Sequence, residues 1–583
     1  MKIKGFNKGS EIMSRKKVLP IGHENFKEII DKNLYYADKS MLIYDILKRE
    51  EKNVLFMRPR RFGKTLNMSM LKYFFDIREK GNEYLFDGLK IAEHYDEVGK
   101  DRNAYPVISL SLKEAKKSCF EDAFYYIKIA IQNQFENYRY VWESDKVKLN
   151  EREQAKRIMS EDAEPKIMGN AIRLLSSCLH DYYNKNVVLL IDEYDVPLEA
   201  AYLNGYYNEM VGFIRTLFSS GLKTNDNLKL AVITGCLRVS KESVFTGLNN
   251  LTAVSILSEA YSEYFGFTRN ETDDILKYYG LEGKAEDLKK WYDGYLFGKT
   301  EVYNPWSVLN QIRVWDNNPE ALAQPWWINT SGNDIIRTLV EYADDEINEQ
   351  IEELIQGKSI TTTLNENVTY MDIKEEGENI WSFLYYTGYL KIIEVIPGEE
   401  GEEEEYRMVI PNLEVRRCYR KIIRNYFKSH TSKNVNKSRL YAYLLEGKAD
   451  EFAESVTEIM EDTISFYDTA ENFYHGFLAG ILTGYEGYRV KSNRENGNGR
   501  TDLTILQKRP RETAVIIEFK VCGSEEELEK TAEKALEQIE NRKYDSEIRM
   551  DRYKNILKYG IAFCKKECCA RMKKSYPKIK VNS

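Results

Sequence analysis

The chain has 583 residues, of which 43% are hydrophobic and 31% are charged, and its formal net charge at pH 7 is −8. This length is too great for one hydrophobic core and predicts about three or four domains in a globular protein. The negative charge argues against a polybasic protein that coats nucleic acid, although a local basic face can still bind it.

The first ten residues lack the apolar core of a secretory signal, and no apolar stretch is long enough to span a bilayer. We therefore expect a cytoplasmic protein with no membrane partner. The eight cysteines are scattered, and the one cluster, Cys564, Cys568 and Cys569, contains no Cys-x-x-Cys pair. Reduced structural thiols are expected in preference to disulfides or a zinc site.

After a polar tail and two short helical patterns, the apolar residues 54–57 predict a strand. The loop RPRRFGKT follows at 58–65, and apolar side chains then recur at helical spacing from Leu66 to Phe74. A strand, a tight loop that ends in Gly-Lys-Thr and a helix together indicate a phosphate-binding loop.

The chemistry of this loop would be nucleotide binding. Backbone N–H groups at the start of the helix favour a phosphate, Lys64 would reach the terminal phosphates, and the Thr65 hydroxyl would hold magnesium. Arg58 stands where the usual pattern has its first glycine, so the chain turns there without a residue that readily accepts positive φ. Taken by itself, the loop leaves two alternatives open, a variant geometry or impaired binding.

The segment 186–195 holds a second apolar run, which predicts a strand buried on both faces and ends in Asp192 and Glu193. The carboxyl edge of an α/β sheet is where ligands bind. Asp192 is expected to hold hydrated magnesium and Glu193 to polarise the attacking water. The alternative is a buried strand whose acids merely begin a loop.

Helical patterns at 120–135 and 208–222 alternate with strands, the last at 228–235, which predicts a mostly parallel sheet. Thr234 ends its strand where a hydroxyl would sense the terminal phosphate. Arg238 would act as an arginine finger, in cis or across the boundary of a homo-oligomer. A surface salt bridge is the alternative for Arg238.

The pattern is mainly helical from Phe265 onward. A helix at 380–389, a hairpin with an acidic tip and a helix at 413–427 suggest a winged-helix-like unit. The acidic tip would repel phosphate. Along the last helix a basic stripe could follow a phosphate backbone, and a solvated helix face is the alternative; its members are Arg416, Arg417, Arg420, Lys421, Arg424 and Lys428.

The final segment holds a second group of charged residues. Asp502 and Glu518 lie on two predicted strands that a hairpin would bring to one edge. There they could share a divalent metal with Glu471 from an upstream helix, while Lys520, on the same strand face as Glu518, activates water. The alternative is a strand with alternating surface charges.

The next helix, 525–540, carries Gln538, and Tyr544 follows it. These two residues are a candidate nucleic-acid contact pair, and helix packing is the competing interpretation.

Six motifs in combination resemble the bacterial AAA-ATPase-like proteins: Leu19–Gly22, Tyr36–Ser40, Arg58–Thr65, Ile191–Asp195, Trp291–Tyr295 and Tyr303–Trp306. The carboxyl-terminal part resembles the PD-(D/E)XK nuclease-like domain that is fused to them. The resemblance covers nearly the whole chain, and Arg58 resembles the variant loop of that family.

This resemblance implies an α/β multidomain fold with an AAA-type P-loop parallel sheet, a helical and winged-helix-like middle region and a restriction-endonuclease-like α/β domain. The expected boundaries are an amino-terminal tail at 1–17, the ATPase domain at 18–264, the lid and winged-helix-like region at 265–447 and the nuclease-like domain at 448–583. The first acid of the nuclease site would be Glu471, the second Asp502 and the third Glu518, with Lys520 as the lysine.

Together these observations predict an ATPase that uses ATP and Mg²⁺, coupled to a metal-dependent nuclease acting on DNA. The nucleotide would be held by Arg60, Arg61, Phe62, Gly63, Lys64, Thr65, Asp192, Thr234 and Arg238. Metals would be held by Thr65 and Asp192 and by Glu471, Asp502 and Glu518. The catalytic residues would be Glu193, Lys520, Asp502 and Glu518. The alternative is a nucleotide-switched interaction protein whose nuclease-like domain binds nucleic acid or a partner without cleavage.

Overall fold

The computed structural model describes residues 16–223, 225–237, 245, 250–327, 345–369, 371, 379–398, 403–421, 437–463, 471–483, 485–496, 499–508, 512–542, 544, 548 and 553–575. The chain divides into two compact units. The first is formed by residues 1–330 and 361–415, and the second by residues 331–360 and 416–583.

A five-stranded sheet in the order β2-β3-β4-β1-β5 organises the first unit, and every neighbouring pair is parallel. Its strands are β1 (Asn53–Met57), β2 (Val107–Ser111), β3 (Val187–Asp192), β4 (Leu228–Gly235) and β5 (Leu251–Val254). Every residue of β1 and β3 is buried, as expected of strands covered on both faces. The predicted parallel α/β sheet is confirmed.

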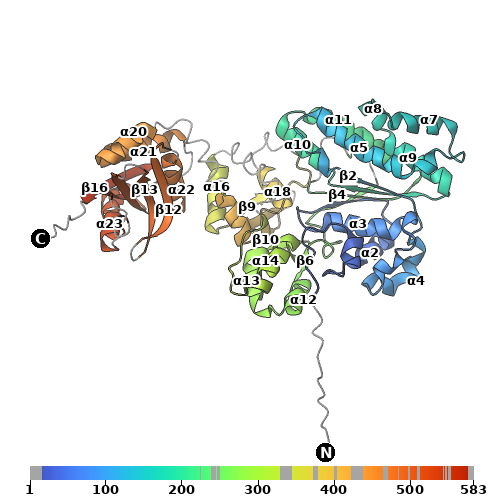
Figure 1. Cartoon of the computed structure of the whole chain (residues 1–583), viewed down its shortest axis with the longest axis horizontal. Coiled ribbons are helices and arrows are strands. Elements are labelled where there is room, and N and C mark those ends of the chain that lie inside the picture. Colours follow the sequence, from blue (N-terminus) through green and yellow to red (C-terminus); the bar gives the residue numbers. More distant parts are fainter. Residues whose placement is uncertain are drawn as a thin grey trace, which may run out of the picture. The chain divides into compact units, whose positions relative to one another are not determined.

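Helices cover both faces of this sheet (Figure 1). The helices of this part of the chain are α1 (Phe26–Asp31), α2 (Met41–Arg49), α3 (Lys64–Phe75), α4 (Tyr95–Val98), α5 (Phe120–Asn137), α6 (Arg139–Trp142), α7 (Leu149–Ile158), α8 (Pro165–Met168), α9 (Ala171–Tyr183), α10 (Val196–Asn204) and α11 (Tyr207–Phe218). Because β1 and β4 are neighbours, their carboxyl ends and the end of β3 lie at one edge, where α3 begins.

The helical middle region contains α12 (Arg269–Tyr279), α13 (Ala285–Tyr292) and α14 (Pro305–Asn317). The antiparallel strands β6 (Phe267–Thr268), β7 (Tyr295–Phe297) and β8 (Thr300–Tyr303) join them in the order β6-β8-β7. The Asn304 side chain accepts the N–H groups of Trp306 and Ser307, and Pro305 is the first residue of α14. Asn304 and Pro305 therefore define the start of α14 as an N-cap and a first-turn proline.

The chain continues through α16 (Asp345–Gln356), β9 (Ile360–Thr363), α18 (Asn379–Tyr386), β10 (Lys391–Ile396) and β11 (Glu405–Val409). Pairing of β10 with β11 confirms the predicted hairpin, and β9 adds a third strand beside β11. Residues 413–421 are helical, whereas Arg424 and Lys428 lie outside the described residues. The phosphate-tracking role of the basic stripe stays a prediction.

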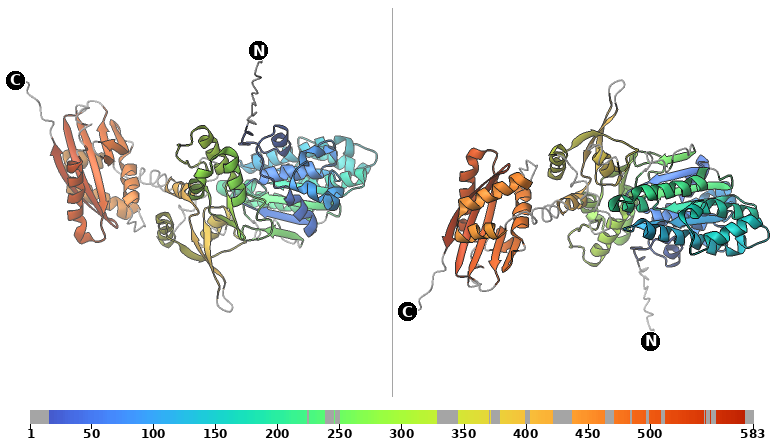
Figure 2. Two further views of the ribbon diagram at one scale, coloured as in Figure 1. Left: turned by 90° about the horizontal axis from the view of Figure 1, so that it is seen from below. Right: turned by 90° about the horizontal axis from the view of Figure 1, so that it is seen from above.

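The second unit contains a five-stranded sheet in chain order, β12 (Tyr488–Asn496), β13 (Gly499–Gln507), β14 (Thr513–Val521), β15 (Asn555–Cys564) and β16 (Glu567–Ser575). Only β14 and β15 are parallel among these neighbouring pairs. The associated helices are α20 (Lys437–Glu446), α21 (Ala449–Thr463), α22 (Glu471–Leu482) and α23 (Leu528–Asn541), and they cover the two faces of the sheet (Figure 2).

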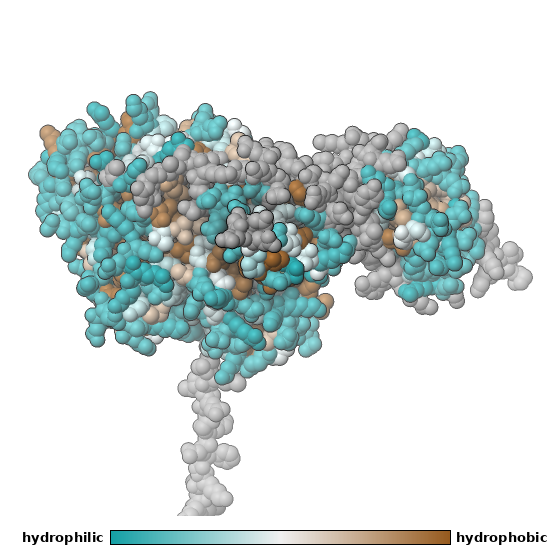
Figure 3. All heavy atoms as spheres, turned by 180° about the vertical axis from the view of Figure 1, so that it is seen from behind, coloured by the Kyte–Doolittle hydropathy of each residue, from teal (hydrophilic) through white to brown (hydrophobic). Residues whose placement is uncertain are grey.

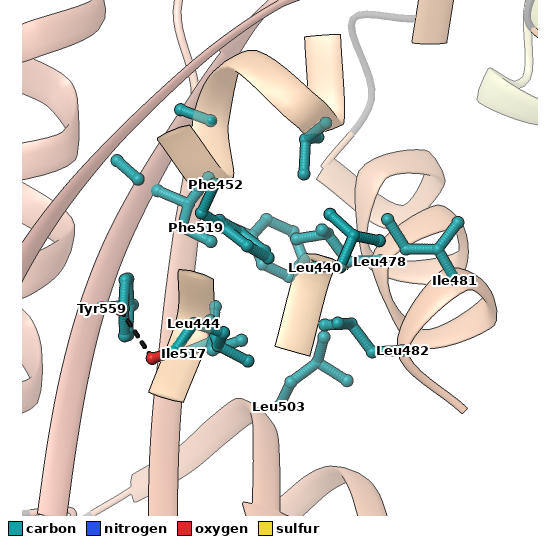
Figure 4. Close-up of a cluster of buried hydrophobic side chains, with 14 of the residues drawn as sticks. Leu440, Leu444, Phe452, Leu478, Ile481, Leu482, Leu503, Ile517, Phe519 and Tyr559 are labelled. Atoms are coloured by element: carbon teal, nitrogen blue, oxygen red, sulfur yellow. Dashed lines mark hydrogen bonds between the residues drawn. The ribbon is translucent and has the colours of Figure 1, made fainter. Parts of the chain in front are cut away.

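Alternate residues of β14 belong to two different cores. Val515, Ile517 and Phe519 face α20, α21 and α22, whose buried side chains include Leu440, Leu444, Phe452, Leu478, Ile481 and Leu482 (Figure 4). Ala514 and Ile516 belong to the core with Ile539 of α23. Strand alternation therefore directs Glu518 and Lys520 to the α23 side of the sheet.

Among the described residues, no helix is long and apolar enough to cross a membrane. The face of the molecule in Figure 3 is mostly hydrophilic over its described part, with small apolar patches. All eight cysteines are free thiols, as expected from their spacing.

A buried carboxyl group, that of Glu414, ties the end of the first unit to α14 and to the residues that follow α14. Glu414 is fully buried, and its Oε1 accepts the backbone N–H groups of Trp326 at 2.5 Å and Trp327 at 2.8 Å. Its Oε2 accepts the Ser307 hydroxyl at 2.7 Å. Burial raises the pKa of Glu414 from its ordinary value of 4.5 to about 7.

The first prediction concerns the pH dependence of stability. Between its unfolded and folded pKa values, Glu414 holds a proton in the folded chain and not in the unfolded chain. The free energy of unfolding of the first unit should therefore fall as pH rises from 4.5 to about 7, by up to about 1.4 kcal/mol per pH unit. Glu414→Gln should flatten this slope in denaturation measured at several pH values. An identical slope in both proteins would contradict the assignment.

The second prediction concerns the contact of α23 with β15. A Cβ atom at Gly560 would lie 2.2 Å from the Ala532 carbonyl oxygen and 2.4 Å from the Leu536 nitrogen. Gly560→Ala should therefore push α23 away and cost about 1–3 kcal/mol, seen as faster hydrogen exchange of the α23 amides. Gly523→Ala is the matched control because a Cβ atom there meets nothing within 4 Å. Equal exchange in both variants would show that the sheet tolerates the methyl group.

Candidate functional site

The phosphate loop turns at Arg61 and Gly63, whose φ angles are 70° and 84°. Gly63 is the residue before α3, and a Cβ atom there would meet no neighbour within 4 Å, so glycine is favoured by its backbone conformation rather than by space. Arg58 does not have a positive φ, and its N–H group donates to Gly235 O at 3.0 Å. The backbone at the first position of this loop therefore needs no glycine, and nucleotide binding by this variant loop stays a prediction.

The Arg58 side chain lies buried beneath the loop. Its Nη1 donates to three carbonyl oxygens at 2.8–2.9 Å, those of Met57, Val254 and Ser255. Its guanidinium group also lies 5.2 Å and 5.0 Å from the ring centroids of Phe265 and Phe297. Burial lowers the pKa of Arg58 to about 9, so the group keeps its charge at neutral pH. The arginine thus joins β1 to the carboxyl end of β5.

Lys64 points into the loop that precedes it. Its Nζ donates to the carbonyl oxygens of Arg58 at 2.8 Å and Pro59 at 3.0 Å, and it lies 3.6 Å from Cys236 Sγ. The side chain is buried. The ammonium group is therefore already held inside the loop, at the amino end of α3.

Asp192 brings three elements together at the carboxyl edge of the sheet. Its Oδ2 accepts the hydroxyl of Thr65 at 2.7 Å, and its Oδ1 accepts the hydroxyl of Thr234. The three residues come from β3, α3 and β4. Hydroxyl and carboxylate oxygens are the ligands that Mg²⁺ prefers, so this donor set fits the metal expected from the sequence.

Glu193 adopts a left-handed backbone conformation with a φ of 55° directly after β3. Its N–H group lies 3.5 Å from the Thr234 hydroxyl. Burial, followed by the negative charge of Asp192, raises the pKa of the Glu193 carboxyl group. A carboxyl group with a raised pKa beside an aspartate that is predicted to hold a metal is suited to accept a proton from water.

The residues that follow Glu193 shape the end of β4. Asp195 accepts the N–H groups of Cys236 at 2.7 Å and Leu237 at 3.4 Å. A Cβ atom at Gly235 would lie 2.5 Å from the Tyr194 ring, so only glycine allows this close contact. Arg238, the predicted arginine finger, lies outside the described residues.

Three side chains of the phosphate loop contact other parts of the first unit. Arg60 forms an ion pair with Glu199 of α10. The Arg61 guanidinium group lies 4.4 Å from the ring centroid of Trp306. The ring of Phe62 packs 4.9 Å from that of Tyr295. Their role as nucleotide contacts stays a prediction.

Trp306 and Tyr295 are contacts that sequence reasoning missed, although both lie in the motifs used to recognise the family. Both residues entered the sequence prediction only as members of the motifs Trp291–Tyr295 and Tyr303–Trp306. No periodicity relates residues so distant in the chain to the phosphate loop. Their place among the motifs that carry the family resemblance was the available signal.

The predicted hairpin of β13 and β14 is confirmed by its antiparallel register, which extends to the pair Leu503↔Ile517. One step further, this register places Asp502 opposite Glu518. Asp502 Oδ2 accepts the N–H group of Phe519 at 3.1 Å. The structure therefore brings Asp502 and Glu518 together on neighbouring strands.

Glu518 is 4% exposed, and its Oε1 accepts the side-chain amide of Gln538 on α23. Gln538 thus contacts the candidate acid directly. Tyr544 is fully buried in the core on the α23 side, which favours the packing interpretation for this residue. Lys520 is partly exposed near the end of β14, and alternation places it on the same face as Glu518.

Glu471 is the first residue of α22, and its side chain lies outside those that the structure describes. Within the described part of the chain, no group of three or more His, Cys, Asp or Glu side chains could hold a metal ion. The carboxylates of Asp502 and Glu518 nevertheless supply oxygen ligands of the type that Mg²⁺ and Mn²⁺ prefer. A third carboxylate, such as the predicted Glu471, would come from beyond the described side chains, and water can fill the other positions around Mg²⁺.

Comparisons with known proteins match the two parts of the chain in which these candidate residues lie. Residues 20–245 match the family model described as predicted AAA-ATPase, and residues 469–573 match that of the PD-(D/E)XK nuclease superfamily. An "uncharacterized protein in vnfD 5'region" of Azotobacter chroococcum mcd 1 is 26% identical over 555 residues, which cover 92% of this chain and 94% of that protein. The chain thus combines a predicted AAA-ATPase-like domain with a carboxyl-terminal domain of the PD-(D/E)XK nuclease superfamily.

Proposed function

We propose that this protein binds and hydrolyses ATP with Mg²⁺, and that its nucleotide state controls a metal-dependent nuclease that acts on DNA. The observation that carries the ATPase proposal is the convergence of Lys64, Thr65, Asp192 and Thr234 at one edge of a parallel sheet. The two family matches support nucleotide-hydrolysing and nuclease-like domains.

In the ATPase site, Mg²⁺ would neutralise part of the phosphate charge when it is bound with ATP. Thr65 and Asp192 would hold it. Lys64 would exchange its contacts with loop carbonyl groups for phosphate oxygens, and Thr234 would detect the terminal phosphate. Glu193 would orient the attacking water and take its proton, as its raised pKa favours.

The remaining loop residues, Arg60, Arg61, Phe62 and Gly63, would hold the loop closed around the phosphates. Arg238 would act as an arginine finger, in cis or from a neighbouring copy in a homo-oligomer. The support for the closed loop is its set of contacts with Glu199, Trp306 and Tyr295.

In the nuclease-like domain, Asp502 and Glu518 would hold Mg²⁺ or Mn²⁺ together with Glu471. Such an ion would activate water and stabilise charge on the scissile phosphate. Lys520 would orient the attacking water from the same strand face as Glu518. The support is the register, which ends at Leu503↔Ile517, together with the hydrogen bond from the Phe519 N–H group to Asp502 Oδ2.

The second candidate function is a nucleotide-switched interaction protein that binds nucleic acid or a partner without cutting. The burial of Glu518 and its hydrogen bond with Gln538 favour it, because a metal ligand would have to exchange part of this environment for a cation. Cleavage by the full chain distinguishes the two functions.

The third prediction tests the phosphate loop. Lys64→Ala should lose ATP binding because the loop then lacks its cation, whereas Glu193→Gln should keep ATP binding and slow hydrolysis by about 100-fold or more. Fluorescent ATP binding and phosphate release measure the two steps. Lys72→Ala, at the opposite end of α3, is the matched control and should resemble wild type. Equal ATP affinity in folded Lys64→Ala and wild type would remove the loop from the mechanism.

The fourth prediction tests the metal site. Asp502→Asn should lose both Mn²⁺ binding, measured by calorimetry, and cleavage of labelled DNA, because it removes a charged ligand. Lys520→Ala should keep Mn²⁺ binding and lose cleavage. Lys508→Ala, an exposed lysine near the other end of the hairpin, serves as the control. If the wild-type chain binds DNA tightly without cutting it, and Asp502→Asn binds DNA equally well, the interaction protein would be favoured.

A further inference from the structure

Strands β13 and β14 separate at Asp502. Their pairing extends from Leu506↔Ala514 to Leu503↔Ile517, whereas β13 continues to pair with β12 as far as Asn496↔Gly499. Beyond Leu503, the Asp502 carboxylate accepts the N–H group of Phe519 on β14. The candidate acids therefore lie where the two strands part, and the distance between the strands at this point sets the distance between the acids.

His475 of α22 contacts both strands at this point. Its Nε2 lies 3.1 Å from the Asp502 carbonyl oxygen. Because a carbonyl oxygen can only accept, Nε2 carries the hydrogen and donates it. The imidazole ring also stacks on Phe519, with centroids 5.7 Å apart and planes at 27°. The buried His475 side chain thus contacts the backbone of Asp502 on β13 and the ring of Phe519 on β14.

The helix that carries His475 is firmly packed. The preceding Tyr474 stacks on Phe563 of β15, with centroids 4.3 Å apart, and its hydroxyl donates to Lys565 O at 2.7 Å. Further along α22, Leu478 and Ile481 are fully buried in the same core as Phe519 (Figure 4). Because α22 is held along its length, the position of the His475 ring is set by the core and not by a mobile surface.

We propose that His475 is a positioning residue that holds Asp502 at the separation from Glu518 required for a shared divalent cation. This inference rests on the proposed nuclease function. An apolar side chain would fill the same volume, but it would leave the Asp502 carbonyl group without this donor. Residues that orient metal ligands typically change metal affinity by about 10–100-fold when they are replaced.

The fifth prediction compares three variants of the full chain. His475→Leu and His475→Phe remove the donor, and the phenylalanine keeps an aromatic ring beside Phe519. Both should bind Mn²⁺ at least about tenfold more weakly than wild type in calorimetry, with Asp502→Asn as the baseline for this site. His475→Gln, whose amide can donate to the same carbonyl oxygen, should recover most of the affinity. Hydrogen exchange of the peptide that contains Phe519 should accelerate in the first two variants and recover in the third.

The outcomes separate the positioning role from the nuclease itself. Wild-type Mn²⁺ affinity and Phe519 exchange in a folded His475→Phe protein would overturn the role of His475 and leave the nuclease proposal standing. Equal losses in His475→Phe and His475→Gln would also overturn it, because packing rather than the hydrogen bond would then be responsible. A wild-type chain without an Asp502-dependent Mn²⁺ site would instead overturn the proposed nuclease, and the inference with it.

Discussion

The two hydrogen bonds that Asp192 accepts are the interaction on which the organisation of the first unit depends. A buried carboxylate is costly unless donors surround it, and here the donors are the hydroxyl groups of Thr65 and Thr234. The three residues belong to three different elements. The same contacts that stabilise the buried charge therefore align the start of α3 with the ends of β3 and β4, where the phosphates are expected.

The phosphate loop is also embedded in the surrounding protein. Arg58 joins it from below to the end of β5, Arg61 stacks on Trp306 of α14, and Phe62 packs on Tyr295 of β7. A Cβ atom at Gly388 would lie 3.1 Å from the Pro59 Cβ, so glycine permits a further close contact. Because these contacts are packed, a change in the loop cannot occur without movement of its neighbours.

In the second unit, two helices on opposite faces of one sheet contact the two candidate acids. His475 of α22 contacts Asp502, and Gln538 of α23 contacts Glu518. This arrangement follows from strand alternation, which directs Phe519 to the α22 core and Glu518 to α23. The packing of α22 and α23 on the two faces therefore affects the positions of Asp502 and Glu518.

The sequence by itself determined the elements whose signal is local. Apolar runs located β1, β3 and β4, the loop before α3 was identified by Gly-Lys-Thr, and the hairpin that carries Asp502 and Glu518 followed from two strands and a turn. Only the tertiary structure decided how Arg58 occupies the position of a glycine and which motifs pack on the loop. It also decided that Gln538 contacts Glu518 and that His475 contacts the backbone of Asp502. These contacts join residues far apart in the chain. Hydrophobic periodicity identifies the buried face of an element but not the partner that covers it.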